Sequence, residues 1–157
     1  MKQNAGFTLI ELLVTLVIIG ILAAAVFPLS ETSVRRAQEK ELRQALWEIR
    51  GALDAYKRAV DEGRILRSAD QSGYPPSLGV LVEGVTDAKD PKGRKIYFLR
   101  RVPRDPMADD PAAAPEQTWG KRSYDSPPES PRAGRDIFDV YSLSRRTGLN
   151  GIPYREW

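Results

Sequence analysis

A single carboxylate stands inside the most apolar stretch of this 157-residue chain. The stretch, GFTLIELLVTLVIIGILAAAVFP at residues 6–28, contains Glu11 only five residues from its left edge. A carboxylate deep in a bilayer costs about 2.5–3.5 kcal/mol on insertion scales, so we expect it to have a partner or a role. A cut just before Phe7 supplies a partner, because it places an ammonium four positions before Glu11, within one helical turn. The same ammonium can instead meet Glu11 of a neighbouring copy.

The rest of the chain lacks the side chains that enzymes and metal sites use most often. There is no cysteine and no histidine, which removes disulfides, thiolate ligands, the commonest zinc ligand and the commonest general base. No phosphate-binding loop or nucleotide fingerprint is present, and no nucleophile is paired with a base. We therefore predict that the protein is not an enzyme.

Two charged clusters remain, and a solvated surface is the favoured interpretation of each. Asp105, Asp109 and Asp110 fall in a proline-rich loop, for which a weak cation site is the alternative. The arginines of LRRVPR, residues 99–104, form a basic patch, for which a groove for DNA or for an acidic partner subunit is the alternative. A net charge of +3 is too small to imply a nucleic-acid partner, and aromatic residues are not interleaved with the basic ones. No nucleic acid is expected.

The apolar run is long enough to cross a membrane as a helix. A bilayer core needs about 20 apolar residues, and between Phe7 and Leu29 the polar interruptions are two threonines and Glu11. The flanking basic residues do not decide the orientation. A cleavable secretory signal and a buried soluble helix are alternatives, and the small residues at 23–25 give the first some support. We predict a transmembrane helix over residues 7–29.

A second, amphipathic helical pattern follows. Pro28 lacks a backbone donor and is expected to kink the helix. Beyond it, apolar residues recur at spacings of three, four and seven over residues 42–60, which is one face of a helix. Gly63 is a suitable residue to end this helix. Core packing or contacts at the rim of the core are favoured over a ligand site for Trp47 and Tyr56.

Short elements are predicted in the remaining residues. Ser77 is placed to cap a short helix that runs to Glu83. KIYFL, residues 95–99, is a strand or an extended loop, and DIFDVYSLS, residues 136–144, is the best candidate strand. The fold class expected is α+β: a long N-terminal helix packed on a small antiparallel sheet, with long loops.

The N-terminal run resembles that of type IV pilins and type II secretion pseudopilins, from residue 2 to about residue 30. In that family a short basic leader ends in glycine, an inner-membrane prepilin peptidase cuts after it, and the new N-terminal residue, usually phenylalanine, is N-methylated. The resemblance implies cleavage after Gly6 and methylation of Phe7. Glu11 is then the fifth residue of the mature chain, where the family keeps its assembly glutamate. That carboxylate pairs with the amine of another subunit, which offsets much of the cost of burying either charge.

The soluble half resembles the major pseudopilins of type II secretion in the order of its landmarks. YPPSLGVLV, LRRVPRDP, WG and DVYSLS stand where that group has a YP turn, a short helix, a DPWG loop and a YSLG strand. Here Asp105-Pro106 and Trp119-Gly120 are separated by an insertion. The absence of cysteine favours the same group, because type IV pilins usually close a C-terminal disulfide loop.

One departure from the family concerns a metal. Members commonly follow the YSLG strand with an acidic loop that binds Ca²⁺, whereas this chain reads YSLSRRTGLNGIPYREW. The expected carboxylates are replaced by Arg145, Arg146 and Thr147. Calcium takes six to eight oxygen ligands, and two guanidinium groups repel it. We predict no calcium and no other cofactor; hydrogen bonds, and an arginine paired with an acidic residue such as Asp139, hold the loop, with Tyr154 and Trp157 as packing anchors.

The resemblance also implies an organisation and a location. Residues 1–6 are a leader peptide, residues 7–29 a transmembrane and filament-core helix, and residues 30–157 a periplasmic domain that includes the amphipathic half of the long helix. The protein crosses the inner membrane once, with its C-terminal domain in the periplasm, and enters a periplasmic filament on assembly.

The function implied is that of a structural subunit. The protein forms a helical homopolymer, the pseudopilus, that drives type II secretion through an outer-membrane secretin. Its partners are copies of itself, other pseudopilins, the prepilin peptidase that also methylates, and the inner-membrane assembly platform with its cytoplasmic ATPase. The alternative is a type IV pilin or minor pilin of a surface fibre, serving adhesion, motility or DNA uptake.

Overall fold

The computed structural model describes the chain from residue 8 onward, apart from the side chains of residues 24–31. It contains two compact units, Met1–Ala37 and Gln38–Trp157. The helices are α1 (Leu9–Asp61) and α2 (Leu78–Glu83), with single 3₁₀ turns at Pro115–Thr118 and Tyr154–Glu156. The strands are β1 (Val85–Thr86), β2 (Lys95–Ile96), β3 (Trp119–Arg122) and β4 (Asp139–Ser142). This is the α+β class that the sequence predicts.

The long helix α1 is continuous in its backbone, including position 28. The side chain of Pro28 lies outside the described part, and the expected kink stays a prediction. The large apolar side chains between Leu9 and Leu22 are all exposed in the isolated chain. Among the residues that the structure describes, no helix has both the length and the apolarity to cross a membrane.

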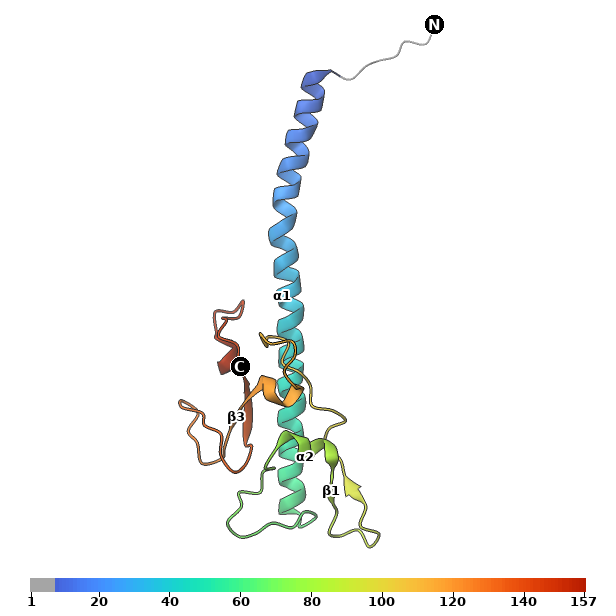
Figure 1. Ribbon diagram of the computed structural model, residues 1–157, viewed down its shortest axis with the longest axis vertical. Coiled ribbons are helices and arrows are strands. Elements are labelled where there is room, and N and C mark those ends of the chain that lie inside the picture. Colours follow the sequence, from blue (N-terminus) through green and yellow to red (C-terminus); the bar gives the residue numbers. More distant parts are fainter. Residues whose placement is uncertain (1–7) are drawn as a thin grey trace. The chain divides into compact units, whose positions relative to one another are not determined.

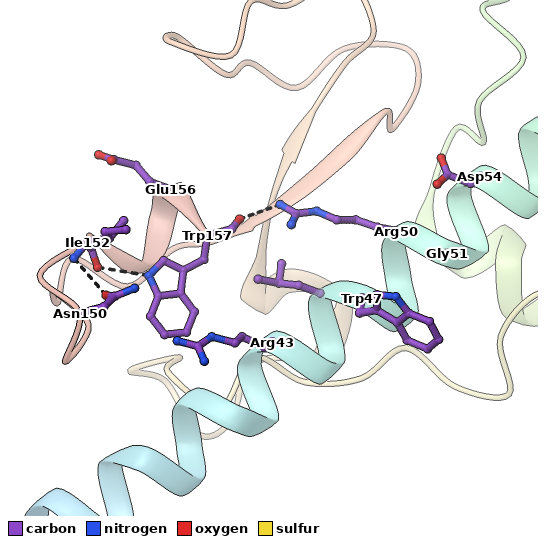
Figure 2. A pocket seen from close by; sticks show the side chains of 10 residues that line it. Arg43, Trp47, Arg50, Gly51, Asp54, Asn150, Ile152, Glu156 and Trp157 are labelled. Carbon is purple, nitrogen blue, oxygen red and sulfur yellow. Dashed lines mark hydrogen bonds between the residues drawn. The ribbon is translucent and has the colours of Figure 1, made fainter.

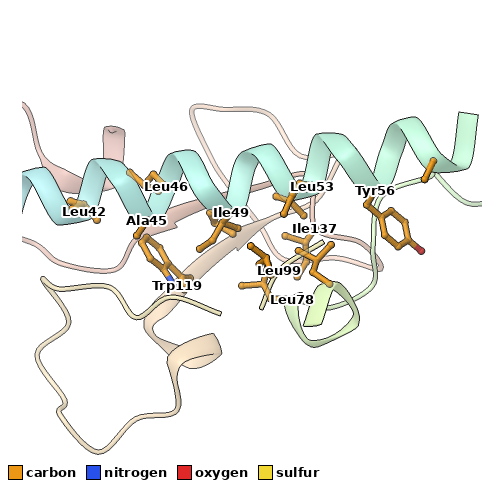
Figure 3. Packing of buried hydrophobic residues seen from close by; sticks show 14 of the residues in the cluster. Leu42, Ala45, Leu46, Ile49, Leu53, Tyr56, Leu78, Leu99, Trp119 and Ile137 are labelled. Carbon is orange, nitrogen blue, oxygen red and sulfur yellow. The ribbon is translucent and has the colours of Figure 1, made fainter. Parts of the chain in front are cut away.

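The second unit is built on the C-terminal half of α1, beside which α2, β1 and β3 are arranged (Figure 1). The predicted apolar face of α1 is its buried face, which Figure 3 shows packed against Leu78, Leu99, Trp119 and Ile137. Burial of each such side chain contributes about 1.5–3 kcal/mol. The members of this face are Leu42, Ala45, Leu46, Ile49, Leu53, Tyr56 and Val60. The prediction of an amphipathic helix is confirmed.

The short helix α2 begins where the sequence predicts. The Ser77 hydroxyl accepts a hydrogen bond from the N–H of Val80 at 3.4 Å, which satisfies one of the free donors at the helix start. Leu78 and Leu81 are fully buried on the face toward α1. Because the Leu81 carbonyl accepts from the N–H groups of residues 98 and 99, the chain after β2 is tied to α2 instead of extending the ladder.

The strands form two separate two-stranded antiparallel sheets, β1 with β2 and β3 with β4, where the sequence predicts one small sheet. KIYFL is a strand only at Lys95–Ile96, for the reason just given. DIFDVYSLS is a strand only at Asp139–Ser142: the N–H of Phe138 still donates to the Arg122 carbonyl of β3, but the N–H of Ile137 donates to the carbonyl of Pro75 at 2.8 Å. These competing bonds limit the length of both ladders.

The insertion between Asp105 and Trp119 is a closed loop. The indole N–H of Trp119 donates to the Pro103 carbonyl at 2.8 Å, and the N–H of Asp105 donates to the Thr118 hydroxyl at 3.1 Å. Arg104 reaches across the loop to the Ala113 carbonyl at 2.6 Å. Both ends of the insertion are therefore fixed beside the start of β3.

Asp105 is buried, with 1% of its surface exposed, so its assignment to a solvated acidic cluster is wrong. Its carboxylate accepts from the Ser142 hydroxyl at 2.6 Å and from the N–H of Met107 at 2.7 Å. Burial raises the pKa of this carboxyl, against the opposing effect of these two hydrogen bonds and of the charge of Arg146. Asp109 and Asp110 are exposed, as expected.

The raised pKa of Asp105 predicts a pH-dependent stability difference. The folded-state pKa of Asp105 lies above its unfolded-state pKa. Its contribution to the free energy of unfolding is therefore fully present below the unfolded-state pKa and is lost as pH rises through the folded-state pKa. Relative to wild type, Asp105→Asn is therefore expected to be least stable in acid and to recover toward neutral pH. Melting temperatures of the full-length protein in detergent, measured at a series of pH values, test this. A deficit that stays constant or grows as pH rises contradicts it.

Candidate assembly site

Glu11 lies in the first turn of α1, which Thr8 caps. The Thr8 side-chain oxygen accepts from the N–H of Glu11 at 3.3 Å, and the Thr8 carbonyl accepts from the N–H of Leu12 at 3.2 Å. Thr8 thus acts as the N-cap that fixes where the helix begins, and Glu11 stands at capping-box spacing from it. A carboxylate in this turn is also favoured by the positive end of the helix dipole.

Glu11 is exposed in the isolated subunit, as are its helical neighbours. Within the described part of the chain, no cation lies in ion-pair distance of its carboxylate. Gly6 and Phe7, the predicted cleavage and methylation positions, lie outside the described residues. The pairing of Glu11 with an amine therefore stays a prediction.

A groove of about 500 Å³ lies between α1 and the C-terminal segment. Figure 2 shows that Trp157, Ile152 and Asn150 form one side of it, while Arg43, Trp47 and Gly51 of α1 form the other. Trp47 is 79% exposed, so it is neither part of the core nor a covered rim residue. Along α1 the groove presents apolar groups interspersed with three charged side chains, those of Arg43, Arg50 and Asp54.

Arg43 and Arg50 connect α1 to the C-terminal segment. The Arg43 guanidinium lies 4.4 Å from the centre of the Trp157 ring, in a cation–π contact. Arg50 donates to the Trp157 backbone oxygen at 2.7 Å, to the Val140 carbonyl at 3.1 Å and to the Asp139 carboxylate at 2.8 Å (Figure 2 shows the first of these). The segment is therefore fixed to the helix and forms a stable wall of the groove.

Asp139 is paired with arginine, as expected, but its partners come from α1 and β3 and not from the C-terminal loop. Asp139 pairs with Arg50 at 2.8 Å and with Arg122 at 3.4 Å. The register of the ladder explains this, because Arg122 of β3 stands directly opposite Asp139 of β4. Arg146 instead donates to the Met107 carbonyl at 3.2 Å. Tyr154, 1% exposed, is the packing anchor that the sequence predicts, and its ring meets that of Trp157 edge to face.

Glu39 is a functional candidate that the sequence analysis missed. It is 6% exposed and accepts hydrogen bonds from the N–H of Leu149 at 2.7 Å and from the hydroxyl of Tyr154 at 3.0 Å. A signal was present in the sequence, because Glu39 stands three residues before Leu42 and so continues the buried face of α1 toward the N-terminus. A charged residue on such a face needs a partner.

The basic patch is smaller than predicted. Arg104 is used within its own loop, which leaves Arg100 and Arg101 exposed at the surface. These two line a second groove, of about 910 Å³, together with Glu41 and Glu48 of α1. The groove therefore carries both signs of charge, a poor match for the uniform negative charge of a nucleic-acid backbone.

Comparison with known proteins gives one matching family model and several similar proteins. The family model described as the prokaryotic N-terminal methylation motif matches residues 1–27. A type II secretion system core protein G from Pseudomonas aeruginosa is 35% identical over 146 residues, 90% of this chain and 84% of that protein. Proteins of the same name from Klebsiella pneumoniae and Vibrio cholerae are 32% and 31% identical, covering 70% of this chain in each case and 74% and 70% of their own lengths. No solved structure matches.

Proposed function

Because this chain belongs to the family of type II secretion system core protein G, we propose that it is a structural subunit of the pseudopilus of type II secretion. The observation that carries this function is the similarity over 90% of the chain to one such protein, together with the methylation motif at its N-terminus. The relatives are structural proteins, and we expect no enzymatic activity. Assembly with other pseudopilins follows from membership of the family.

The N-terminal segment serves processing and anchoring. A prepilin peptidase removes residues 1–6, and the new N-terminus at Phe7 is methylated; the match to the methylation motif supports both steps. The apolar composition of residues 7–29 supports a single membrane span, with the C-terminal domain in the periplasm. The capping of α1 by Thr8 supports a helix that begins directly after the new N-terminus.

Assembly lifts each subunit from the membrane into a helical homopolymer. Head-to-tail contacts that do not close into a ring generate such a filament. An inner-membrane platform and its cytoplasmic ATPase drive the addition of subunits, and the growing pseudopilus pushes folded proteins through an outer-membrane secretin. The exposed apolar residues of α1 from Leu9 to Leu22 support a packed filament core, since an apolar surface of this size is unfavourable in water.

Deletion of the gene in the host is expected to abolish secretion of specific enzymes while leaving surface fibres unchanged. Because the proposed pseudopilus pushes the secreted proteins through the secretin, secretion should fall to the level of a secretin deletion. Culture supernatants, together with electron microscopy of sheared fibres, test this, and complementation with the intact gene is the control. Loss of fibres, twitching or DNA uptake with normal secretion would contradict the proposal and assign the chain to surface pili.

A further inference from the structure

We infer that the buried carboxylate of Glu39 fastens the C-terminal loop, residues 144–157, to α1, and that this loop takes no calcium ion. The inference goes beyond the role of a pseudopilus subunit and does not depend on which filament the protein builds. It concerns a loop for which the resemblance to the family implies an acidic calcium site.

The groups of the loop that converge on Glu39 are hydrogen-bond donors. One oxygen of Glu39 accepts from the N–H of Leu149 at 2.7 Å and from the hydroxyl of Tyr154 at 3.0 Å. Leu149 and Tyr154 stand on the two arms of the loop, so this single oxygen holds both arms. A calcium site requires oxygen acceptors that converge on a cation. Here the polarity is the reverse, since N–H and O–H groups converge on an anion supplied by the helix.

Two backbone carbonyls of the loop are already used in closing it. The N–H of Gly148 donates to the Ile152 carbonyl at 2.8 Å, and the N–H of Tyr154 donates to the Arg146 carbonyl at 3.2 Å. An isolated bridge pairs Thr147 with Pro153. The two arms therefore hold each other by their backbones, with Glu39 completing the closure.

The charge of the loop also opposes a bound cation. Its side chains include three arginines and one glutamate, which gives 3 − 1 = +2. The guanidinium of Arg146 lies 3.2 Å from the Met107 carbonyl, and its charge acts on the buried Asp105 carboxyl. Within the described part of the chain, no three histidine, cysteine, aspartate or glutamate side chains are grouped to hold a metal. The residues present do not fit calcium.

The far end of the loop has its own attachment to α1. Arg50 donates to the Trp157 backbone oxygen at 2.7 Å, the contact drawn in Figure 2. Glu39 and Arg50 are 11 residues apart, about 16 Å along the helix. The helix therefore holds the loop at two separated points, one through an acceptor and one through a donor.

Limited trypsin digestion of the full-length protein in detergent tests the inference, because the loop carries cleavable bonds after Arg145 and Arg146. Cleavage there is followed by mass spectrometry, with cleavage at the exposed Arg100 and Arg101 as an internal reference. Glu39→Ala is expected to speed loop cleavage about tenfold or more relative to the reference, as hydrogen bonds to a charged group are lost. Glu62→Ala, at an exposed position just after the end of the same helix and away from both the loop and the reference site, is the matched control and should change neither rate.

In the wild-type protein, the ratio of loop cleavage to reference cleavage is expected to be the same with added calcium chloride and with a calcium chelator. If calcium slows cleavage of the loop relative to the reference site and the chelator reverses this, the inference that the loop takes no calcium is wrong. If the ratio of loop cleavage to reference cleavage is the same in Glu39→Ala as in wild type, Glu39 does not fasten the loop. If Glu39→Ala fails to fold, Glu39→Gln replaces it; this variant keeps the shape and one acceptor but loses the charge, and a smaller selective increase is expected.

Discussion

Replacement of Glu11 by alanine is expected to leave cleavage after Gly6 intact and to abolish assembly of the pseudopilus. The predicted pair of this carboxylate with the N-terminal amine of another subunit is buried in the filament core, and removing one partner of such a pair costs about 3–5 kcal/mol. That is a loss of more than about a hundredfold in subunit affinity. The start of α1 should survive the change, because its cap uses the backbone N–H of Glu11 and the side chain of Thr8.

Immunoblots that separate the precursor from the processed chain measure cleavage, and sheared pseudopili and secreted enzymes measure assembly. Thr15→Ala is the matched control. Its hydroxyl donates to the Leu12 carbonyl at 2.9 Å, so its hydrogen bond is made within its own helix. Normal filaments from Glu11→Ala would refute the pairing, whereas loss of cleavage would show that Glu11 acts in processing.

Gly120→Ala is expected to destabilise the soluble domain by about 1–3 kcal/mol, the usual cost of overpacking. A Cβ at position 120 would lie 2.3 Å from ring atoms of Tyr141, its partner in the β3–β4 ladder. The ring must then leave its place over the strand, or the two strands must separate. This close approach explains why a glycine follows Trp119 in the WG landmark.

Gly51→Ala is the matched control, with an effect of opposite sign. Nothing lies within 4 Å of a Cβ at position 51, in the middle of α1. Alanine there should stabilise the helix by about 0.5–1 kcal/mol, because glycine loses more backbone entropy on folding. Denaturant titration of the full-length variants in detergent measures both changes. Equal stabilities for Gly120→Ala and wild type would mean that the Tyr141 ring moves aside without cost.

The long helix and its buried face were predictable because the same spacing that makes a helix amphipathic also decides what it buries. The burial of the apolar residues between Leu42 and Val60 could be predicted from the period of 3.6 residues per turn alone. The cap at Ser77 was predictable for a similar reason, since a capping hydroxyl acts on a backbone N–H three residues away. Local signals of this kind are complete within a few residues of sequence.

The contacts that hold the C-terminal loop were not predictable, because they join residues far apart in sequence. Glu39 accepts hydrogen bonds from residues 149 and 154. Asp139 pairs with Arg50 and Arg122, although the arginines of the loop are nearer to it in sequence. The burial of Asp105 likewise depends on the position of Ser142 in another strand. The sequence singled out Asp105 and Asp139 but not Glu39, and it could not show which charged groups would become neighbours.

The insertion between Asp105 and Trp119 is anchored at both ends, by the Trp119 indole on the Pro103 carbonyl and by Thr118 on the N–H of Asp105. With its ends fixed, the length of chain between them is nearly free to change, since each doubling of a flexible loop costs only about 0.6 kcal/mol in closure entropy. Relatives can therefore lengthen or shorten this segment without moving β3. It is the place where a subunit of this family can acquire a new surface while its filament-forming helix stays the same.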